Sequence, residues 1–315
     1  MAAETGEQLH AIFGTGPLGQ AVMRELIKKD QNVRITSRHP RIKGNDRVDV
    51  VAGDASDPEF CKQLCAGATV VYNCANAPYN KWPQLLEPLF TNILEGAAAA
   101  QARLVVADNL YMYRSDTGPM TEDTPVEPVS RKGEVRARVA AKMLKAHDEG
   151  KTKVLIGRAS DFFGPQVTLA SVGSQVFKPA IKGGRAQVIG DPDKLHTYTF
   201  IDDFGRALVL LGEHEDAFGQ VWHAPSGETL NTREFVSMIY DTAGNKAKML
   251  RAPRWLFSVM GWFNPPIGEI KEMLYQFESD FVMDSSKFRN RFGDTSTPNR
   301  KAIAKTVKWF RDNLN

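Results

Sequence analysis

The chain has 315 residues, of which 42% are hydrophobic and 24% charged, and its formal net charge is +3. This balance is typical of a soluble globular protein and excludes a wholly disordered chain. The length is enough for one large domain or two modest ones, and the small net charge gives no general reason to expect a nucleic acid or a membrane as partner. Lysine and arginine gather in 131–153 and 284–315, where helical spacing favours the solvated face of a helix.

The cysteines and the apolar stretches argue against a metal-binding, a secreted and a membrane-spanning protein. Cys61 and Cys65 lie four residues apart, as on one helix face, and no cluster of histidine or cysteine completes a metal site. We therefore expect no metal, and reduced, mostly buried thiols. The first ten residues lack the apolar core of a signal peptide, and the apolar stretch 256–263 is too short to span a bilayer. These observations predict a cytoplasmic protein.

Short apolar strands alternate with helical patterns through the first half of the chain. The predicted strands are 9–13, 33–36, 48–51, 70–72, 104–107 and 153–158, and helices are predicted after the first strand and near 57–65, 82–100 and 131–149. This alternation indicates βαβ units with right-handed crossovers. It predicts an α/β fold with a doubly wound parallel Rossmann sheet.

Glycine and proline become denser after about residue 160. Helical patterns continue at 202–212, 231–243, 267–277 and 300–313, with short strands near 186–190 and 220–224. We predict a Rossmann domain over 1–165 and a C-terminal part over 166–315. The second part would complete the sheet and form a small mixed substrate cap. Neither an internal repeat nor a low-complexity linker is found in the sequence.

A glycine-rich motif follows the first predicted strand and opens the first predicted helix. It reads Gly14-Thr-Gly16-Pro17-Leu18-Gly19. Such a loop needs one glycine for the tight turn, one for close approach to a pyrophosphate and one for helix–strand packing. The helix N-terminus, with Pro17 in its first turn, then offers unpaired N–H groups to the phosphates. In this strand–turn–helix context the motif predicts a dinucleotide site, the alternative being a turn that only packs.

The residues after the second predicted strand bear on the choice of cofactor. The segment 35–40 contains Ser37 and Arg38 but no acid that could hold the adenosine ribose hydroxyls. Ser37 could hydrogen-bond a 2′-phosphate and Arg38 could pair with it, which favours NADP(H) over NAD(H). Arg38 could also be an unrelated surface residue. Asp54, after the third strand, is a candidate contact for the adenine amino group or the cap of the following turn.

Together these residues resemble the short-chain dehydrogenase/reductase superfamily, in its extended and atypical branch of NAD-dependent epimerase/dehydratase-like proteins. The likeness covers nearly the whole chain and rests on the order and spacing of several segments. These are the glycine loop, Gly53-Asp54, Tyr72-Asn73-Cys74-Ala75, Asn109–Tyr113, Glu122–Pro125, Arg158–Pro165 and Tyr198–Asp203. The resemblance implies a Rossmann domain that binds NAD(P), with Asn73 and Ala75 among its cofactor contacts, and a small substrate cap.

The catalytic signature of the extended branch does not carry over to this chain. The resemblance places Tyr113 where family members keep a tyrosine, but Asn109 stands at the position of the family's serine. Lys132 and Arg136 occupy the two positions of the Tyr-x-x-x-Lys pair. Lys132 could protonate a substrate oxygen if burial or Arg136 lowered its pKa from about 10.4. Arg136 could stabilise an oxyanion and Asn109 could donate one hydrogen bond. The rival hypothesis is that Lys132 and Arg136 form the outer face of a basic helix.

Four further residues are candidates on their position in the chain. Tyr113 and Tyr79 could face the nicotinamide as proton donors, with packing or substrate contact as the default interpretation. Ser160 and Asp161 follow the sixth strand, at the sheet edge where doubly wound folds bind ligands. They are candidate substrate contacts, although for Asp161 we favour capping of the turn at 162–164.

Three residues of the second half are expected to be structural. His196 reads as an exposed loop histidine, and Asp202 or Asp203 as the cap of the following helix. Aromatic residues in this half suggest an apolar or aromatic substrate, although a core of its own explains them equally well. They are Phe177, Trp255, Phe257, Trp262 and Phe263.

The leading hypothesis is an NADP(H)-dependent oxidoreductase that acts on a small, largely apolar carbonyl, enone or imine. Lys132 would carry out acid/base work, with Asn109 and Arg136 as polar support. One alternative is a non-redox isomerase, lyase or cyclase that uses the cofactor structurally, and another is a non-catalytic NADP sensor. A nucleotide-sugar epimerase fits the resemblance, but the departed catalytic pair counts against it. The expected partner is a small-molecule substrate, with no nucleic acid and no membrane, and the oligomeric state is open, a homodimer being one option.

Overall fold

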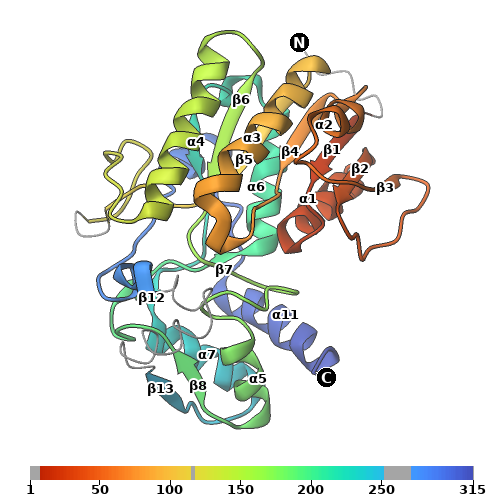
Figure 1. Cartoon of the computed structure of the whole chain (residues 1–315). Coiled ribbons are helices and arrows are strands. Elements are labelled where there is room, and N and C mark those ends of the chain that lie inside the picture. Colours follow the sequence, from red (N-terminus) through yellow and green to blue (C-terminus); the bar gives the residue numbers. More distant parts are fainter. Residues whose placement is uncertain (1–7, 115–117, 252–270, 315) are drawn as a thin grey trace. The chain divides into compact units, whose positions relative to one another are not determined.

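The computed structural model describes residues 8–114, 118–251 and 271–314, which form two compact units (Figure 1). The first unit comprises Met1–Asp108, Ala137–Gly157 and Gly205–Trp222. The second comprises Asn109–Arg136, Arg158–Phe204 and His223–Asn315. The division into domains at residue 165 stays a prediction.

A seven-stranded sheet forms the centre of the first unit. Its order is β11-β6-β5-β4-β1-β2-β3, and the pairs from β3 to β5 are parallel. The strands are β1 (Leu9–Phe13), β2 (Asn32–Ser37), β3 (Val48–Ala52), β4 (Val70–Asn73), β5 (Arg103–Asp108), β6 (Val154–Arg158) and β11 (Val221–His223). The reversal of strand order between β1 and β4 confirms the predicted doubly wound Rossmann sheet.

Helices cover both faces of this sheet. They are α1 (Pro17–Lys28), α2 (Pro58–Cys65), α3 (Trp82–Ala99), α4 (Arg131–Asp148) and α6 (Ile201–Glu213), with short turns η1 (Tyr79–Lys81) and η2 (Glu215–Ala217). On one face α2 packs on α3, and Lys142 of α4 pairs with Glu87 of α3 at 3.2 Å. On the other face Gly205 of α6 lies directly against Ala21 of α1.

Short strand pairs and further helices build the second unit. The pairs are β7 (Phe162–Phe163) with β10 (Thr199–Phe200), β9 (Leu195–His196) with β12 (Leu230–Asn231), and β8 (Ala186–Val188) with β13 (Met249–Arg251). The helices are α5 (Ser174–Lys182), α7 (Thr232–Ala243), α10 (Ser286–Phe292) and α11 (Asn299–Asp312), with a 3-10 turn η3 (Leu274–Phe277). Figure 1 shows α5 and α7 near β8 and β13, and α11 packs on α5 and α7. Phe177 of α5 stacks on Phe310 of α11 within their shared core, 5.0 Å between ring centroids.

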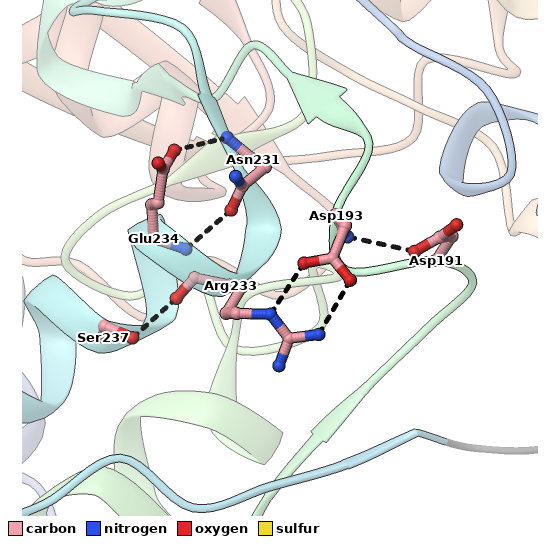
Figure 2. Close-up of polar contacts among 6 residues, drawn as sticks. All are labelled: Asp191, Asp193, Asn231, Arg233, Glu234 and Ser237. Carbon is pink, nitrogen blue, oxygen red and sulfur yellow. Dashed lines mark hydrogen bonds and ion pairs between the residues drawn. The ribbon is translucent and has the colours of Figure 1, made fainter.

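The start of α7 is fixed by two polar arrangements (Figure 2). Asn231 accepts the N–H of Glu234 at 2.8 Å while Glu234 accepts that of Asn231 at 3.2 Å, which is a capping box. Arg233 donates to both carboxylate oxygens of Asp193 at 2.7 and 2.8 Å. These contacts hold the loop before β9 against the first turn of α7.

The structure corrects three predictions of secondary structure. The helix α5 was not predicted, because Pro179 lies inside it and glycines flank it, yet its buried Val176 and Phe177 hold it in the core. The helix predicted over 267–277 lies partly outside the described residues; residues 271 and 272 are helical, but Leu274–Phe277 form a 3-10 turn. Asp202 and Asp203 are in the first turn of α6, which begins at Ile201, so neither is its N-terminal cap.

The cysteines lie in the first unit and are free thiols. Cys61 and Cys65 are buried and Cys74 is half-buried, as predicted. Burial raises the pKa of each thiol to about 12. Among the described residues, no group of histidine, cysteine and carboxylate side chains is arranged to hold a metal ion. Within the same ranges, no helix has the length and apolar character needed to cross a membrane.

Candidate functional site

The glycine motif forms a tight turn at the end of β1. Gly14 has φ +105°, and a Cβ there would lie 2.8 Å from the carbonyl oxygen of Cys74. A Cβ on Gly19 would lie 1.8 Å from the carbonyl oxygen of Gly14. Both positions therefore need glycine, one for its backbone angle and both for close packing. Two of the three roles predicted for the motif are visible in this geometry.

Gly16 presents the opposite situation. No atom of the described residues would lie within 4 Å of a Cβ at Gly16, so among them the space beside its backbone is open. Gly16 is the N-cap of α1, with no side chain capping the helix, and Pro17 stands at the first helical position. The first N–H groups of a helix have no partners within the helix, and its dipole favours negative charge there. Gly16 and Leu18 thus belong to an anion-accepting helix end.

The ends of β2 and β3 lie at the same sheet edge as the glycine turn. The β-ladder pairs Phe13 with Thr36, the residue before Ser37. Ser37 Oγ lies 2.8 Å from Thr15 Oγ1, so its hydroxyl reaches the turn itself. Arg38 is exposed and makes no polar contact with the other residues described. Asp54 Oδ1 accepts the N–H of Ser56 at 3.0 Å, which is the turn-capping alternative.

Asn73 carries the most informative polar atom of this edge. It ends β4 beside Phe13 and is 1% exposed. Its Oδ1 accepts the N–H of Ala75 at 3.2 Å. Its Nδ2 is buried and has no hydrogen-bond partner among the described residues. A buried N–H without an acceptor is costly, so this amide fits a site whose ligand supplies the oxygen.

These residues fit a dinucleotide. The open backbone at Gly16, the uncapped start of α1, the hydroxyl of Ser37 and the orphaned amide of Asn73 are the groups that would hold phosphates and ribose. Tyr79, predicted as a substrate contact, lies in η1 with its ring edge against Trp82, 4.9 Å between centroids.

In the second unit, two of the predicted catalytic side chains are engaged in structural contacts. Asn109 Oδ1 accepts the N–H of Tyr111 at 3.1 Å. Tyr113 is fully buried, and its hydroxyl accepts a hydrogen bond from the Arg158 guanidinium, which also lies over the ring. His223 Nε2 is 3.4 Å from the same hydroxyl. These contacts favour the packing role for Tyr113.

Sequence reasoning missed the buried histidine of this cluster and its neighbours. His223 Nδ1 lies 2.8 Å from the carbonyl oxygen of Asp284, and the backbone N–H of His223 donates to Glu122 Oε1 at 2.7 Å. Burial lowers the pKa of His223 to about 4, and burial raises the pKa of Glu122. The sequence predicts the strand near 220–224, but the alternation of its side chains does not indicate that His223 faces inward.

Lys132 and Arg136 are buried at the start of α4, with 1% and 5% of their surfaces exposed. The hypothesis that they form the outer face of a basic helix is therefore wrong. The Lys132 ammonium donates to Glu272 Oε2 at 3.0 Å, and its backbone N–H donates to Glu272 Oε1 at the same distance. Glu272 was not a predicted site residue, because the two positions lie 140 residues apart.

A second polar group surrounds Asp161. Its Oδ2 accepts the hydroxyl of Ser171 at 3.0 Å and lies 3.4 Å from His196 Nε2, so capping of the turn at 162–164 is not what its carboxylate does. His196 is 2% exposed and stacks on Phe277, 5.0 Å between ring centroids. The prediction of an exposed loop histidine was wrong because partners distant in sequence cover the ring. Ser160 is also buried, and its hydroxyl has no partner among the described residues.

Tyr275 links these groups. Burial raises the pKa of its phenol, with smaller contributions from Tyr111, Asp161 and Glu272. The hydroxyl of Tyr275 is buried and has no hydrogen-bond partner among the described residues. The second unit therefore gathers a phenol, two carboxylates and the Lys132 ammonium, most of them invisible to sequence motifs. Of the aromatic residues considered for a substrate pocket, Phe177 is in the core, and Trp255, Phe257, Trp262 and Phe263 lie outside the described residues.

The comparison with known proteins identifies a family. The model of the NAD dependent epimerase/dehydratase family matches residues 14–224. Sterol-4-alpha-carboxylate 3-dehydrogenase, decarboxylating, from Mus musculus is 22% identical over 95% of this chain and 82% of its own length. An epimerase from Methanothermobacter thermautotrophicus has a similar structure, with a TM-score of 0.82 and 18% identity over 98% of this chain and 94% of its own. The dTDP-glucose 4,6-dehydratase of Bacillus anthracis, solved with NAD, gives 0.78 and 15% identity, covering 97% of each chain.

Proposed function

Because the chain belongs to the NAD dependent epimerase/dehydratase family, we propose that it is an NADP(H)-dependent oxidoreductase acting on a small, largely apolar carbonyl, enone or imine. When bound, the nicotinamide would give or accept the hydride. The observation that carries the proposal is the sheet edge at which the Gly16 backbone is open and the Asn73 amide is orphaned. Family members are NAD(P)-dependent oxidoreductases, epimerases and dehydratases, which supports the proposal.

The preference for NADP(H) rests on the end of β2. Ser37 lies beside the glycine turn and Arg38 is exposed, with no acid in the segment 35–40 to hold ribose hydroxyls. A guanidinium and a hydroxyl suit a 2′-phosphate, because charge-assisted hydrogen bonds to phosphate are the stronger kind.

The cofactor assignment is tested by titrating NADPH and NADH into the wild type and the Arg38→Ala variant. We expect the wild type to bind NADPH more tightly than NADH. Arg38→Ala should lose about tenfold in NADPH affinity, about 1.4 kcal/mol, with NADH affinity unchanged. Arg185→Ala, an exposed arginine of the second unit, is the matched control and should change neither affinity. Equal affinity of the wild type for both cofactors would refute the assignment.

At the reacting oxygen, we propose Lys132 as the principal polar group, with Asn109 and Arg136 in support. Lys132 and Arg136 are buried side chains at the start of one helix. Ser160 and Asp161 would contact the substrate. Alanine at Lys132 should abolish turnover of a true substrate, and unchanged turnover would remove that role.

One observation favours a second candidate function, a cofactor sensor or a non-redox enzyme. The hydroxyl of Tyr113, the tyrosine that the resemblance keeps in its place, accepts a hydrogen bond from Arg158 in the core. A panel of carbonyls, enones and imines, followed at the nicotinamide absorbance band with NADPH, separates the possibilities. Oxidation of NADPH supports the reductase. Turnover with NADP⁺ and no absorbance change supports an isomerase, lyase or cyclase, and cofactor-dependent partner binding without turnover supports a sensor.

A further inference from the structure

A single carboxylate contacts Lys132 at two atoms. Glu272 Oε2 accepts the ammonium and Oε1 accepts the backbone N–H, both at 3.0 Å. The Lys132 side chain is 2% exposed, whereas that of Glu272 is 23% exposed. The carboxylate therefore lies between a buried cation and the solvent, and it reaches the lysine from a segment far away in the sequence.

Besides the ammonium, Glu272 also contacts the backbone at the start of α4. The helix α4 begins at Arg131, and the hydroxyl of Ser130 accepts the N–H of Gly133 at 3.0 Å. Glu272 accepts the backbone N–H of Lys132, the residue before Gly133. Together the two side chains satisfy donors that a helix start leaves open, and the helix dipole favours the negative charge at this end. The carboxylate thus contacts the helix start through one oxygen and the ammonium through the other.

Other charged and titratable groups lie near the pair. Arg131 and Lys271 line the same shallow depression as Glu272, and Arg136 lies one turn along α4. The phenol of Tyr275 is also close to Glu272. A buried ammonium needs a partner, because burial of an unpaired charge is costly. Glu272 supplies a negative charge to Lys132 at 3.0 Å.

We propose that Glu272 is a positioning residue that keeps Lys132 a fixed ammonium ion, so that Lys132 stabilises the reacting oxygen by charge and gives up no proton. This inference rests on the proposed function in placing Lys132 at the reacting oxygen. When a hydride adds to a carbonyl carbon, the electron pair of the C=O bond moves to the oxygen. The ammonium stabilises that oxyanion, and the proton that completes the alcohol comes from water.

The first test needs neither substrate nor cofactor. Lys132 is acetylated with trace acetic anhydride between pH 7 and 11, and the modified peptide is quantified by mass spectrometry. The midpoint of the pH–rate curve reports ionisation, and its plateau reports access of the reagent. In Glu272→Gln we expect the midpoint to fall by about one pH unit, a roughly tenfold faster reaction at pH 8. Glu272→Asp, which keeps the charge, should stay near the wild type.

The control pair is Glu87 and Lys142, whose side chains are each 41% exposed and 3.2 Å apart. Glu87→Gln should leave the Lys142 midpoint nearly unchanged, because exposed ion pairs are weak. A Lys132 midpoint that does not move in folded Glu272→Gln, checked by its melting temperature, overturns the inference. That result would leave the proposed function standing, since NADPH oxidation is measured separately.

The second test uses any substrate found by the NADPH assay. With a fixed ammonium, kcat of the wild type should be flat between pH 6 and 9, and Glu272→Gln should acquire a loss of kcat at the basic end of this range. A basic limb already present in the wild type and unmoved in Glu272→Gln would overturn the inference, because Lys132 would then titrate independently of Glu272.

Discussion

The substitution Gly16→Ala separates the stability of the glycine turn from its use as a binding site. A Cβ at Gly16 meets no protein atom within 4 Å, so the added methyl group causes no clash within the described structure. Gly16 has φ −69° and ψ −178°, which alanine adopts without strain. Removing a glycine from the unfolded chain stabilises by about 0.4–1 kcal/mol, and alanine at an N-cap costs about as much. The two effects offset each other, and we expect the melting temperature to stay within about 2 °C.

The same methyl group occupies the space that a pyrophosphate would need. We expect Gly16→Ala to lose at least about tenfold in NADPH affinity, which is about 1.4 kcal/mol. Fluorescence titration with NADPH and differential scanning fluorimetry of the free protein measure the two quantities on one sample. An unchanged NADPH affinity in folded Gly16→Ala would show that the phosphates do not pass over Gly16, and the reasoning for the site would fail.

Two further glycine variants serve as comparisons for Gly16→Ala. At Gly14 the backbone angle alone costs about 1–2 kcal/mol for alanine, and its Cβ would lie 2.8 Å from a carbonyl oxygen, so Gly14→Ala should lower both melting temperature and affinity. At Gly184, in the second unit, a Cβ would make ordinary contacts at 3.6 Å and beyond, so Gly184→Ala should change neither.

The remaining predictions concern stability. Burial lowers the pKa of His10 from 6.5 to about 4, so the unfolded state binds the proton first, and the contribution of His10 to stability should fall as pH drops from 6.5 to 4, by at most about 3 kcal/mol. His223, whose pKa is also lowered to about 4, adds a loss of its own over the same pH range. Urea denaturation at pH 7 and pH 5 should show this loss, and His10→Gln should reduce it; an equal loss in the variant would contradict the assignment to His10. Asn231→Ala removes the side chain that caps α7 (Figure 2) and should cost about 1 kcal/mol in urea denaturation, and no change would mean that the capping box is not formed in solution. Phe235→Ala, at a core position 1% exposed, should cost about 3–5 kcal/mol, and a loss under 1 kcal/mol would place this ring outside a packed core.

The parts of the fold that were predictable are those with local signals. The strands of the first unit are short buried runs, and the turn at Gly14 and the helix start at Pro17 follow from the chemistry of single residues. The positions of Ser37 and Asn73 follow from the topology, because the carboxyl ends of parallel strands meet at one edge.

The polar groups of the second unit were not predictable in this way. Glu272 reaches Lys132 over 140 residues, and His196 is covered by rings from residues far along the chain. The basic stretch 131–153 was interpreted as the solvated face of a helix, yet Lys132 is buried. Helical spacing alone does not determine which face of a helix is solvated. The chain also passes between the two units at residues 108, 136, 157, 204 and 222, whereas a sequence pattern suggests one boundary.

The low reactivity of the three native thiols makes the protein suitable for labelling at an introduced cysteine. Cys61, Cys65 and Cys74 all have pKa values near 12, so at neutral pH they hold almost no thiolate, the form that attacks maleimides. A cysteine introduced at Leu169, which is 99% exposed, would carry an ordinary thiol. A fluorophore or spin label placed there would report on the second unit without any native cysteine having been removed.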